Sequence, residues 1–187
     1  MSIPAERFAT YEDLCQIPDH MVAQIIHGQL IVMPRPAPKH AMASSSLGGE
    51  LIGPYQKGRG DGPGGWWILD EPELHLGLDI LVPDLAGWRR VRMPTLPETA
   101  FFTLPPDWVC EVLSPSTGQM DRVDKLPIYA EHGVGHAWLV DPELQTLEVF
   151  ALDKGQHWRL ERAFKAEEEV CAPPFQAISF SLGVLWR

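Results

Sequence analysis

The sequence predicts a mixed α/β domain of the α+β type, in which helices flank a mixed central β-sheet and a β-hairpin lies near the N-terminus. Three observations predict this class. Short apolar runs typical of buried strands recur along the chain. One segment between them, residues 40–53, carries apolar residues at helical spacing, and a second, residues 121–131, ends before a glycine as a helix does. The chain has 187 residues, 45% of them hydrophobic and 21% charged, which is the composition of a packed globular chain and favours a single domain over residues 1–187.

The N-terminal part predicts a short helix and then a hairpin. Thr10 lies three residues before Asp13, which indicates an N-cap with a capping-box partner, so we expect a helix over about residues 11–17. In residues 23–33, two β-rich runs flank His-Gly. A glycine at that point supplies the positive φ that a tight hairpin turn needs.

A stiff connector and a longer helix are expected next. Residues 34–38 contain three prolines, which favours an extended chain. Residues 40–53 carry apolar side chains every four residues and predict a helix, although its two adjacent glycines lower the helix propensity. Residues 58–65 form a glycine-rich loop that lacks the phosphate-loop pattern.

The second half of the chain predicts most of the central sheet. Its elements are short strands over 66–69, 73–76 and 80–86, a proline-rich basic loop over 89–97, a buried strand over 108–113, a helix over 121–131, a buried strand over 137–141, a hairpin over 146–163, and a last strand over 175–182.

Charge and cysteine content exclude several function classes. The chain has 15 Lys and Arg against 25 Asp and Glu, a formal charge of -10, which is the wrong sign for coating nucleic acid non-specifically. Its three cysteines are widely spaced, so we expect free thiols, no zinc site and a cytoplasmic location. No apolar stretch approaches the length of a membrane span, and the N-terminus lacks a secretion signal.

Two acidic residues lie in apolar surroundings. Asp84 ends an apolar run, and Glu111 lies inside another. A buried acid is costly unless it is paired, protonated or bound to a cation. Two carboxylates that meet at a sheet suit Mg²⁺, and Lys125 on the following helix could reach the same place. The alternative is structural: Asp84 caps a turn and Glu111 pairs with Lys125.

The motifs around these residues resemble the Uma-type family of restriction-endonuclease-like proteins, a branch of the PD-(D/E)XK nuclease superfamily. The resemblance extends from the hairpin near residue 23 to the strand near residue 150, and residues 111–142 are its most specific part. The strings that carry it are Val82-Pro83-Asp84, Glu111-Val112-Leu113-Ser114-Pro115-Ser116-Thr117, Asp121, Lys125-Leu126, Tyr129-Ala130, Gly133-Val134 and Trp138-Leu139-Val140-Asp141-Pro142.

The resemblance implies a restriction-endonuclease-like fold with a divalent-metal site. Asp84, Glu111 and the backbone carbonyl of Val112 would hold Mg²⁺ or Mn²⁺. The superfamily's usual lysine position is Leu113 in this chain, and its role would pass to Lys125. The implied activity is metal-dependent hydrolysis of phosphodiester bonds by an endonuclease, with Asp84, Glu111 and Lys125 as the catalytic residues.

Further residues would support this site. By the same resemblance, His40 matches a histidine at the start of the first core helix, and Glu50 on that helix could approach the metal. Gln24 stands where the family commonly has Glu, which would reduce the charge of the site. Pro127 lies inside the helix that carries Lys125, and we expect it to kink the helix or to mark its start.

Nucleic acid, with DNA expected first, is the predicted partner. The expected phosphate contacts are Arg89, Arg90 and Arg92, and Arg35 with Lys39 forms a second group. A homodimer would suit the cutting of two strands, and no membrane is involved.

Two rival functions remain open. The first is a catalytically weak or inactive nuclease-like domain that binds a protein or nucleic-acid partner, which the acidic charge, Gln24 and Pro127 favour. The second is a structural protein whose buried acids only pair with lysine.

Overall fold

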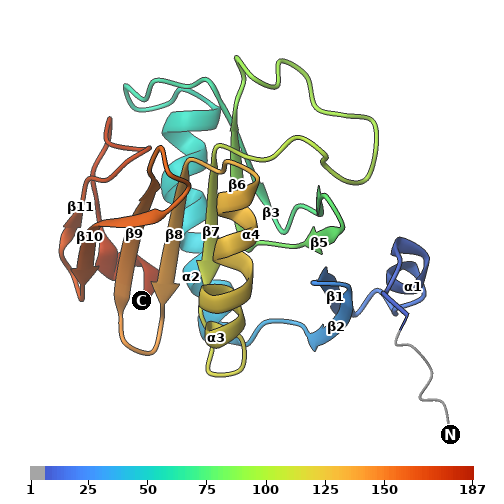
Figure 1. Cartoon of the computed structure of the whole chain (residues 1–187). Coiled ribbons are helices and arrows are strands. Elements are labelled where there is room, and N and C mark those ends of the chain that lie inside the picture. The colour runs from blue at the N-terminus through green and yellow to red at the C-terminus, as the bar shows by residue number, and fades with distance from the viewer. Residues whose placement is uncertain (1–6) are drawn as a thin grey trace, which may run out of the picture.

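The computed structural model describes residues 7–187 and has a six-stranded sheet at its centre (Figure 1). The strand order is β10-β9-β8-β7-β6-β3, and only the β7–β8 pair is parallel. The strands are β3 (Trp66–Asp70), β6 (Leu85–Arg89), β7 (Trp108–Val112), β8 (His136–Asp141), β9 (Thr146–Leu152) and β10 (Trp158–Lys165). The predicted mixed sheet is therefore confirmed.

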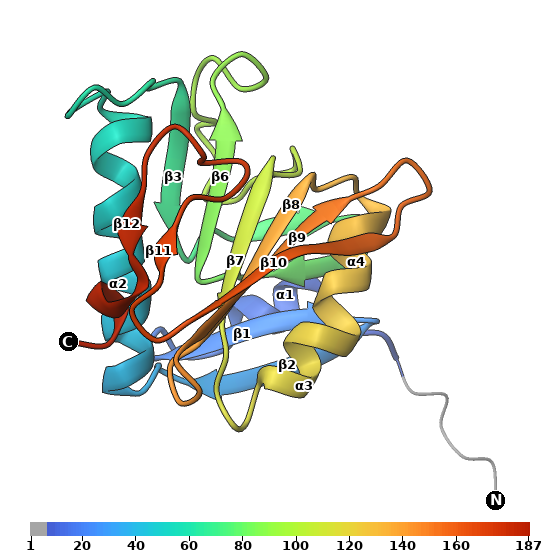
Figure 2. The same cartoon turned by 90° about the vertical axis from the view of Figure 1, so that its left-hand side faces the viewer.

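Helices cover both faces of this sheet, as Figure 2 shows. On one face lies α2 (Pro38–Leu51), which continues into a π-helical turn over Ile52–Gln56. On the other face, α3 (Gly118–Met120), a π-helical turn (Asp121–Lys125) and α4 (Leu126–Glu131) follow one another without a break. None of the helices within residues 7–187 is long and apolar enough to cross a membrane.

The N-terminal hairpin belongs to a second sheet with the order β2-β1-β5-β4. Its turn residues His27 and Gly28 both have positive φ, 51° and 78°, as a tight two-residue turn requires. The preceding helix α1 has the expected capping box between Thr10 and Asp13. The elements are α1 (Tyr11–Cys15), β1 (Met21–Ile26), β2 (Gln29–Pro34), β4 (Leu74–Leu76) and β5 (Asp79–Leu81).

Two predicted strands differ from the structure. The strand expected over residues 80–86 is broken, so β5 lies in the second sheet and β6 in the first. Pro83 lies at the break and cannot donate a ladder hydrogen bond. In residues 175–182 only β12 (Phe180–Ser181) is a strand, paired with β11 (Glu169–Val170). The rest of that tail packs against the core, where Phe175 is buried.

The buried side chains form two clusters, one on each face of the central sheet. Along β7 the side chains alternate between them: Trp108, Cys110 and Val112 contribute to the α2 face, and Val109 to the α4 face. Period-two alternation therefore places Glu111 on the α4 face. Glu111 is thus a buried acid in an otherwise apolar layer.

Candidate active site

Strand register brings Asp84 and Glu111 together. Strands β6 and β7 are antiparallel, with Leu85 opposite Cys110 and Ala86 opposite Val109. Continuing this register by one residue places Asp84 opposite Glu111. Directly opposed residues of such a pair have close side chains. The break at Pro83 leaves Asp84 at the end of β6, where its carboxylate is not enclosed by a further ladder.

The Asp84 carboxylate is held by two groups. Its Oδ2 accepts a hydrogen bond of 2.7 Å from the backbone N–H of Val112, and its Oδ1 lies 3.2 Å from Nε2 of His40. Burial alone would lower the pKa of His40, but the Asp84 carboxylate and the Val112 carbonyl raise it overall. His40 Nδ1 is buried and has no hydrogen-bond partner among residues 7–187. The structure thus places His40 beside Asp84.

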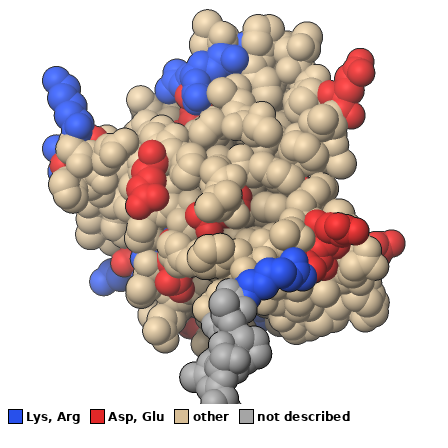
Figure 3. Space-filling model, turned by 45° about the vertical axis from the view of Figure 1, so that its right-hand side comes forward, with Lys and Arg blue, Asp and Glu red and all other residues tan. Residues whose placement is uncertain are grey.

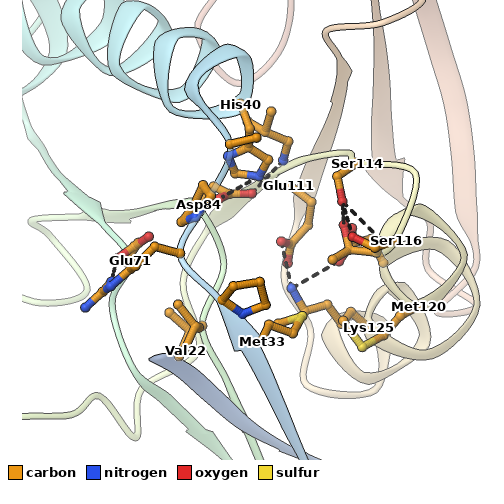
Figure 4. Close-up of a pocket in the computed structure, with 18 residues that line it drawn as sticks. Val22, Met33, His40, Glu71, Asp84, Glu111, Ser114, Ser116, Met120 and Lys125 are labelled. Carbon is orange, nitrogen blue, oxygen red and sulfur yellow. Dashed lines mark hydrogen bonds and ion pairs between the residues drawn. The ribbon is translucent and has the colours of Figure 1, made fainter. Parts of the chain in front are cut away.

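The Glu111 carboxylate points the other way, toward the α3–α4 face (Figure 4). It lies 2.8 Å from Nζ of Lys125 and accepts a hydrogen bond of 2.6 Å from the Tyr129 hydroxyl. Lys125 Nζ also lies 3.2 Å from Oδ1 of Asp121. All four side chains are buried. They form one network, which we call the Lys125 network: Glu111, Asp121, Lys125 and Tyr129.

Burial and neighbouring charges shift the pKa values of Glu111 and Lys125 in opposite directions. Burial raises the pKa of Glu111 to about 8, with Lys125 opposing the shift. Burial would lower the pKa of Lys125, but Glu111 and Asp121 raise it overall. The ammonium is therefore protonated at neutral pH, and Glu111 binds a proton more readily than a free carboxylate. Both effects keep the net charge of the network small.

Asp121 and Tyr129 were not assigned roles from the sequence. With Lys125 they stand at i, i+4 and i+8, which puts all three on one face of a helix. That spacing was the signal that could have found them. Pro127 does not displace Lys125, because the helix continues through a π-helical turn in which the N–H of Leu126 donates to the carbonyl of Asp121.

The two carboxylates and Lys125 line one pocket of about 410 Å³. Its polar wall carries these groups together with His40 and Asp121, and its mouth carries Glu71, whose Oε2 lies 2.9 Å from Arg35. The opposite wall is apolar. It is formed by Val22, Met33, Pro34, Pro36, Ala37 and Val82. Met120 lines the pocket beside Lys125, as Figure 4 shows.

Two expected supporting residues do not line this pocket. Gln24 is buried, and its Oε1 accepts a hydrogen bond of 2.9 Å from the N–H of Val82. It therefore ties β1 to the segment that precedes Asp84. Glu50 is half-buried on α2, ten residues and nearly three turns beyond His40.

The three arginines expected to contact phosphate lie at the other end of β6 from Asp84. Arg89 stacks over the Trp66 ring at 4.8 Å. Arg90 donates to the backbone carbonyls of Trp66 and Gln56. Arg92 pairs with Asp107 at 3.0 Å. The structure does not bring these arginines to the pocket.

The donor set suits a hard divalent cation, because Asp84 and Glu111 offer carboxylate oxygens and Val112 a carbonyl. With the side chains as they stand, no three His, Cys, Asp or Glu residues in the described range 7–187 are arranged to hold a metal ion. The reason is visible in the contacts above: Glu111 faces Lys125 and Tyr129 instead of Asp84.

Comparisons with known proteins give a family from one search and a fold from another. The model of a family described as Uma2, putative restriction endonuclease, matches residues 8–184. A crystal structure of a putative nuclease belonging to DUF820 from Anabaena variabilis is similar, with a TM-score of 0.76 and 23% identity, over 95% of this chain and 97% of that chain. At this identity the likeness shows the fold. No curated protein matches the chain.

Proposed function

Because the chain belongs to the Uma2 family of putative restriction endonucleases, we propose that it is an endonuclease that hydrolyses phosphodiester bonds with Mg²⁺ or Mn²⁺. The observation that carries the proposal is the meeting of Asp84, Glu111 and Lys125 in one pocket. They come from the end of one strand, the middle of the next and a helix. DNA is the nucleic acid that we expect first.

The residues that would hold the cation are Asp84, Glu111 and, through its carbonyl, Val112. A bound divalent cation would lower the pKa of a water molecule that it binds and would offset negative charge on the scissile phosphate. Glu111 is engaged by Lys125 and Tyr129 in the structure. An ionised carboxylate has about four acceptor positions, so Glu111 would coordinate a cation through a position that these contacts leave free or in exchange for one of them.

The remaining residues position charge. Lys125 holds an ammonium beside the pocket, where it would stabilise negative charge that develops on a phosphate. Asp121 fixes that ammonium from the adjacent turn of the helix. His40 and the Val112 N–H hold the Asp84 carboxylate in place. Each of these groups is set before substrate arrives, which is the condition for effective electrostatic stabilisation.

A second function is favoured by one observation. Glu111 and Lys125 are 2% and 3% exposed and satisfy each other at 2.8 Å. A catalytically inactive module that keeps the fold and binds a nucleic-acid or protein partner would tolerate such a closed network.

A cleavage assay tests the proposal. Plasmid, linear duplex, single-stranded DNA and RNA are incubated with the protein in Mg²⁺, Mn²⁺ or chelator. We expect metal-dependent cutting that Asp84→Asn abolishes. Lys125→Ala is expected to slow it by about a hundredfold or more, the usual loss when one preorganised charge-stabilising group is removed.

Matched controls are Asp61→Asn and Lys154→Ala, two exposed positions outside the pocket. Both are expected to cut at the rate of the unmodified protein. Cutting that persists in chelator or in Asp84→Asn would contradict the proposed metal site. No cutting of any substrate, together with no Mn²⁺ binding by calorimetry, would favour the binding module.

A further inference from the structure

The candidate site lies at the bottom of a pocket, not on an open surface. The Glu111 side chain is 3% exposed and the Lys125 side chain 3%, whereas Asp84 nearer the mouth is 15% exposed. A phosphate that reaches these groups must enter the pocket. A nucleobase can enter the same pocket only where it is unpaired, because the bases of an intact duplex lie inside the stack.

The wall opposite the carboxylates is apolar and is built by the N-terminal hairpin. Val22 and Met33 are cross-strand partners in β1 and β2, and both face the pocket. Val82 and Pro34 extend the same wall. Figure 4 shows Val22 and Met33 on the side of the pocket away from Ser114 and Ser116. Such a wall suits a neutral, flat, weakly hydrated group such as a nucleobase.

Cations are sparse around the mouth. Among residues 7–187, the Lys and Arg side chains that line the pocket are Arg35 and Lys125. Arg35 is 54% exposed and is paired with Glu71. On the face in Figure 3, Lys and Arg occur in separate groups and form no continuous band. A duplex is normally bound through many phosphate contacts, and this surface does not provide them.

From these observations, and resting on the proposed nuclease function, we propose that the pocket receives an unpaired nucleotide, with its base against Val22 and Met33 and its phosphate toward Asp84 and Glu111. The substrate class is therefore single-stranded nucleic acid, or a strand with unpaired bases. The pocket volume of about 410 Å³ falls in the range of about 300–1,000 Å³ that is typical of small-ligand sites.

The test compares binding of one labelled DNA sequence in three forms: single strand, full duplex, and duplex with one unpaired nucleotide. Fluorescence anisotropy is measured in chelator, so that metal-dependent cutting does not interfere. We expect the single strand to bind about tenfold or more tightly than the full duplex, because opening a duplex to release a base costs a few kcal/mol. The duplex with an unpaired nucleotide should bind between the two.

Val22→Trp fills the pocket and is expected to remove the preference for the single strand. Val32→Trp is the matched control, because it lies on the same hairpin, 40% exposed and outside the pocket. Circular dichroism and urea unfolding establish that both variants fold.

The outcomes separate this inference from the proposed function. Equal or tighter binding of the full duplex, or a preference that survives Val22→Trp, would overturn the inference while metal-dependent cutting still stood. Absence of binding to every form, together with absence of cutting, would overturn both.

Discussion

Lys125 is a buried cation whose charge is matched by two buried acids. Its ammonium lies 2.8 Å from Glu111 and 3.2 Å from Asp121. We expect Lys125→Met to lower the free energy of unfolding by about 3–5 kcal/mol, because removing one member of a buried ion pair leaves an uncompensated charge. Urea unfolding followed by tryptophan fluorescence measures this loss.

Two further variants test the reason for the loss. Lys154→Met, in the exposed turn between β9 and β10, should leave stability within about 0.5 kcal/mol of the unmodified protein. The double variant Lys125→Met/Glu111→Gln should recover part of the stability, since it removes one of the unpaired charges. An unchanged urea midpoint in Lys125→Met would show that the network contributes nothing to stability.

Sequence reasoning at the residue scale found the chemical groups and, as one alternative, the pairing of Glu111 with Lys125, but not the other two members of the Lys125 network. Asp84 and Glu111 stood out because acids in apolar runs need a reason, and Lys125 because it lies on the helix that follows Glu111. Asp121 and Tyr129 did not, because a tyrosine and an acid on a helix are ordinary until the strand beneath them is known. Which oxygen Lys125 contacts depends on how the helix packs on β7, and that is a tertiary property.

The N-terminal hairpin positions Asp84 through one hydrogen bond. Gln24 on β1 accepts from the N–H of Val82, two residues before Asp84. We expect Gln24→Leu to lower the free energy of unfolding by about 1–3 kcal/mol, because the N–H of Val82 loses its hydrogen-bond partner. Urea unfolding measures the change, and Gln16→Leu on the exposed surface after α1 is the control.

Gln24→Glu distinguishes the positioning role from a metal-binding role. The carboxylate retains an acceptor for Val82, but the side chain does not line the pocket. Calorimetric Mn²⁺ affinity should therefore equal that of the unmodified protein. A clear gain in affinity would place this side chain among the metal ligands and contradict the structure.

Element prediction succeeded where the pattern was local. The capping box of α1, the hairpin turn at Gly28 and the apolar strand β7 are each encoded by neighbouring residues. The prediction of one strand over residues 80–86 was wrong, because its apolar residues belong to strands of two different sheets. The break at Pro83 depends on which strands pair with each half, and that is a tertiary property. Pro127 lies in the first turn of α4, which is one of the two outcomes expected for it, and the π-helical turn before it keeps Lys125 within 2.8 Å of Glu111.

At the scale of the whole molecule, nearness in sequence was a poor guide to nearness in space. Arg89, Arg90 and Arg92 closely follow Asp84, but the first of them is the last residue of β6, five positions after Asp84. A strand advances about 3.3 Å per residue, so these arginines begin about 16 Å from the site. The second sheet could not be predicted from the sequence either. Its β1–β5 pairing joins Ile25 to Ile80, and no local sequence pattern indicates a pairing between residues so far apart.

The distribution of charge over the molecule predicts how nucleic-acid binding depends on salt. The formal charge is -10, and two cations, Arg35 and Lys125, line the pocket within residues 7–187. For a single strand, each phosphate neutralised contributes about -0.7 to the slope of log K against log salt. Two such contacts predict a shallow slope of about -1.4. Anisotropy titrations of labelled single-stranded DNA at several salt concentrations measure it.

Arginine variants at the two ends of the molecule decide which cations make these contacts. Arg35→Ala removes a cation at the mouth and should reduce the magnitude of the slope by about 0.7. Arg92→Ala, at the far end of the sheet and paired with Asp107, should leave the slope unchanged. A steep slope that falls in Arg92→Ala but not in Arg35→Ala would place the strand along the far end of the sheet. Nucleic acid would then bind to arginines that lie far from Asp84 and Glu111, and the pocket would not be where the strand binds.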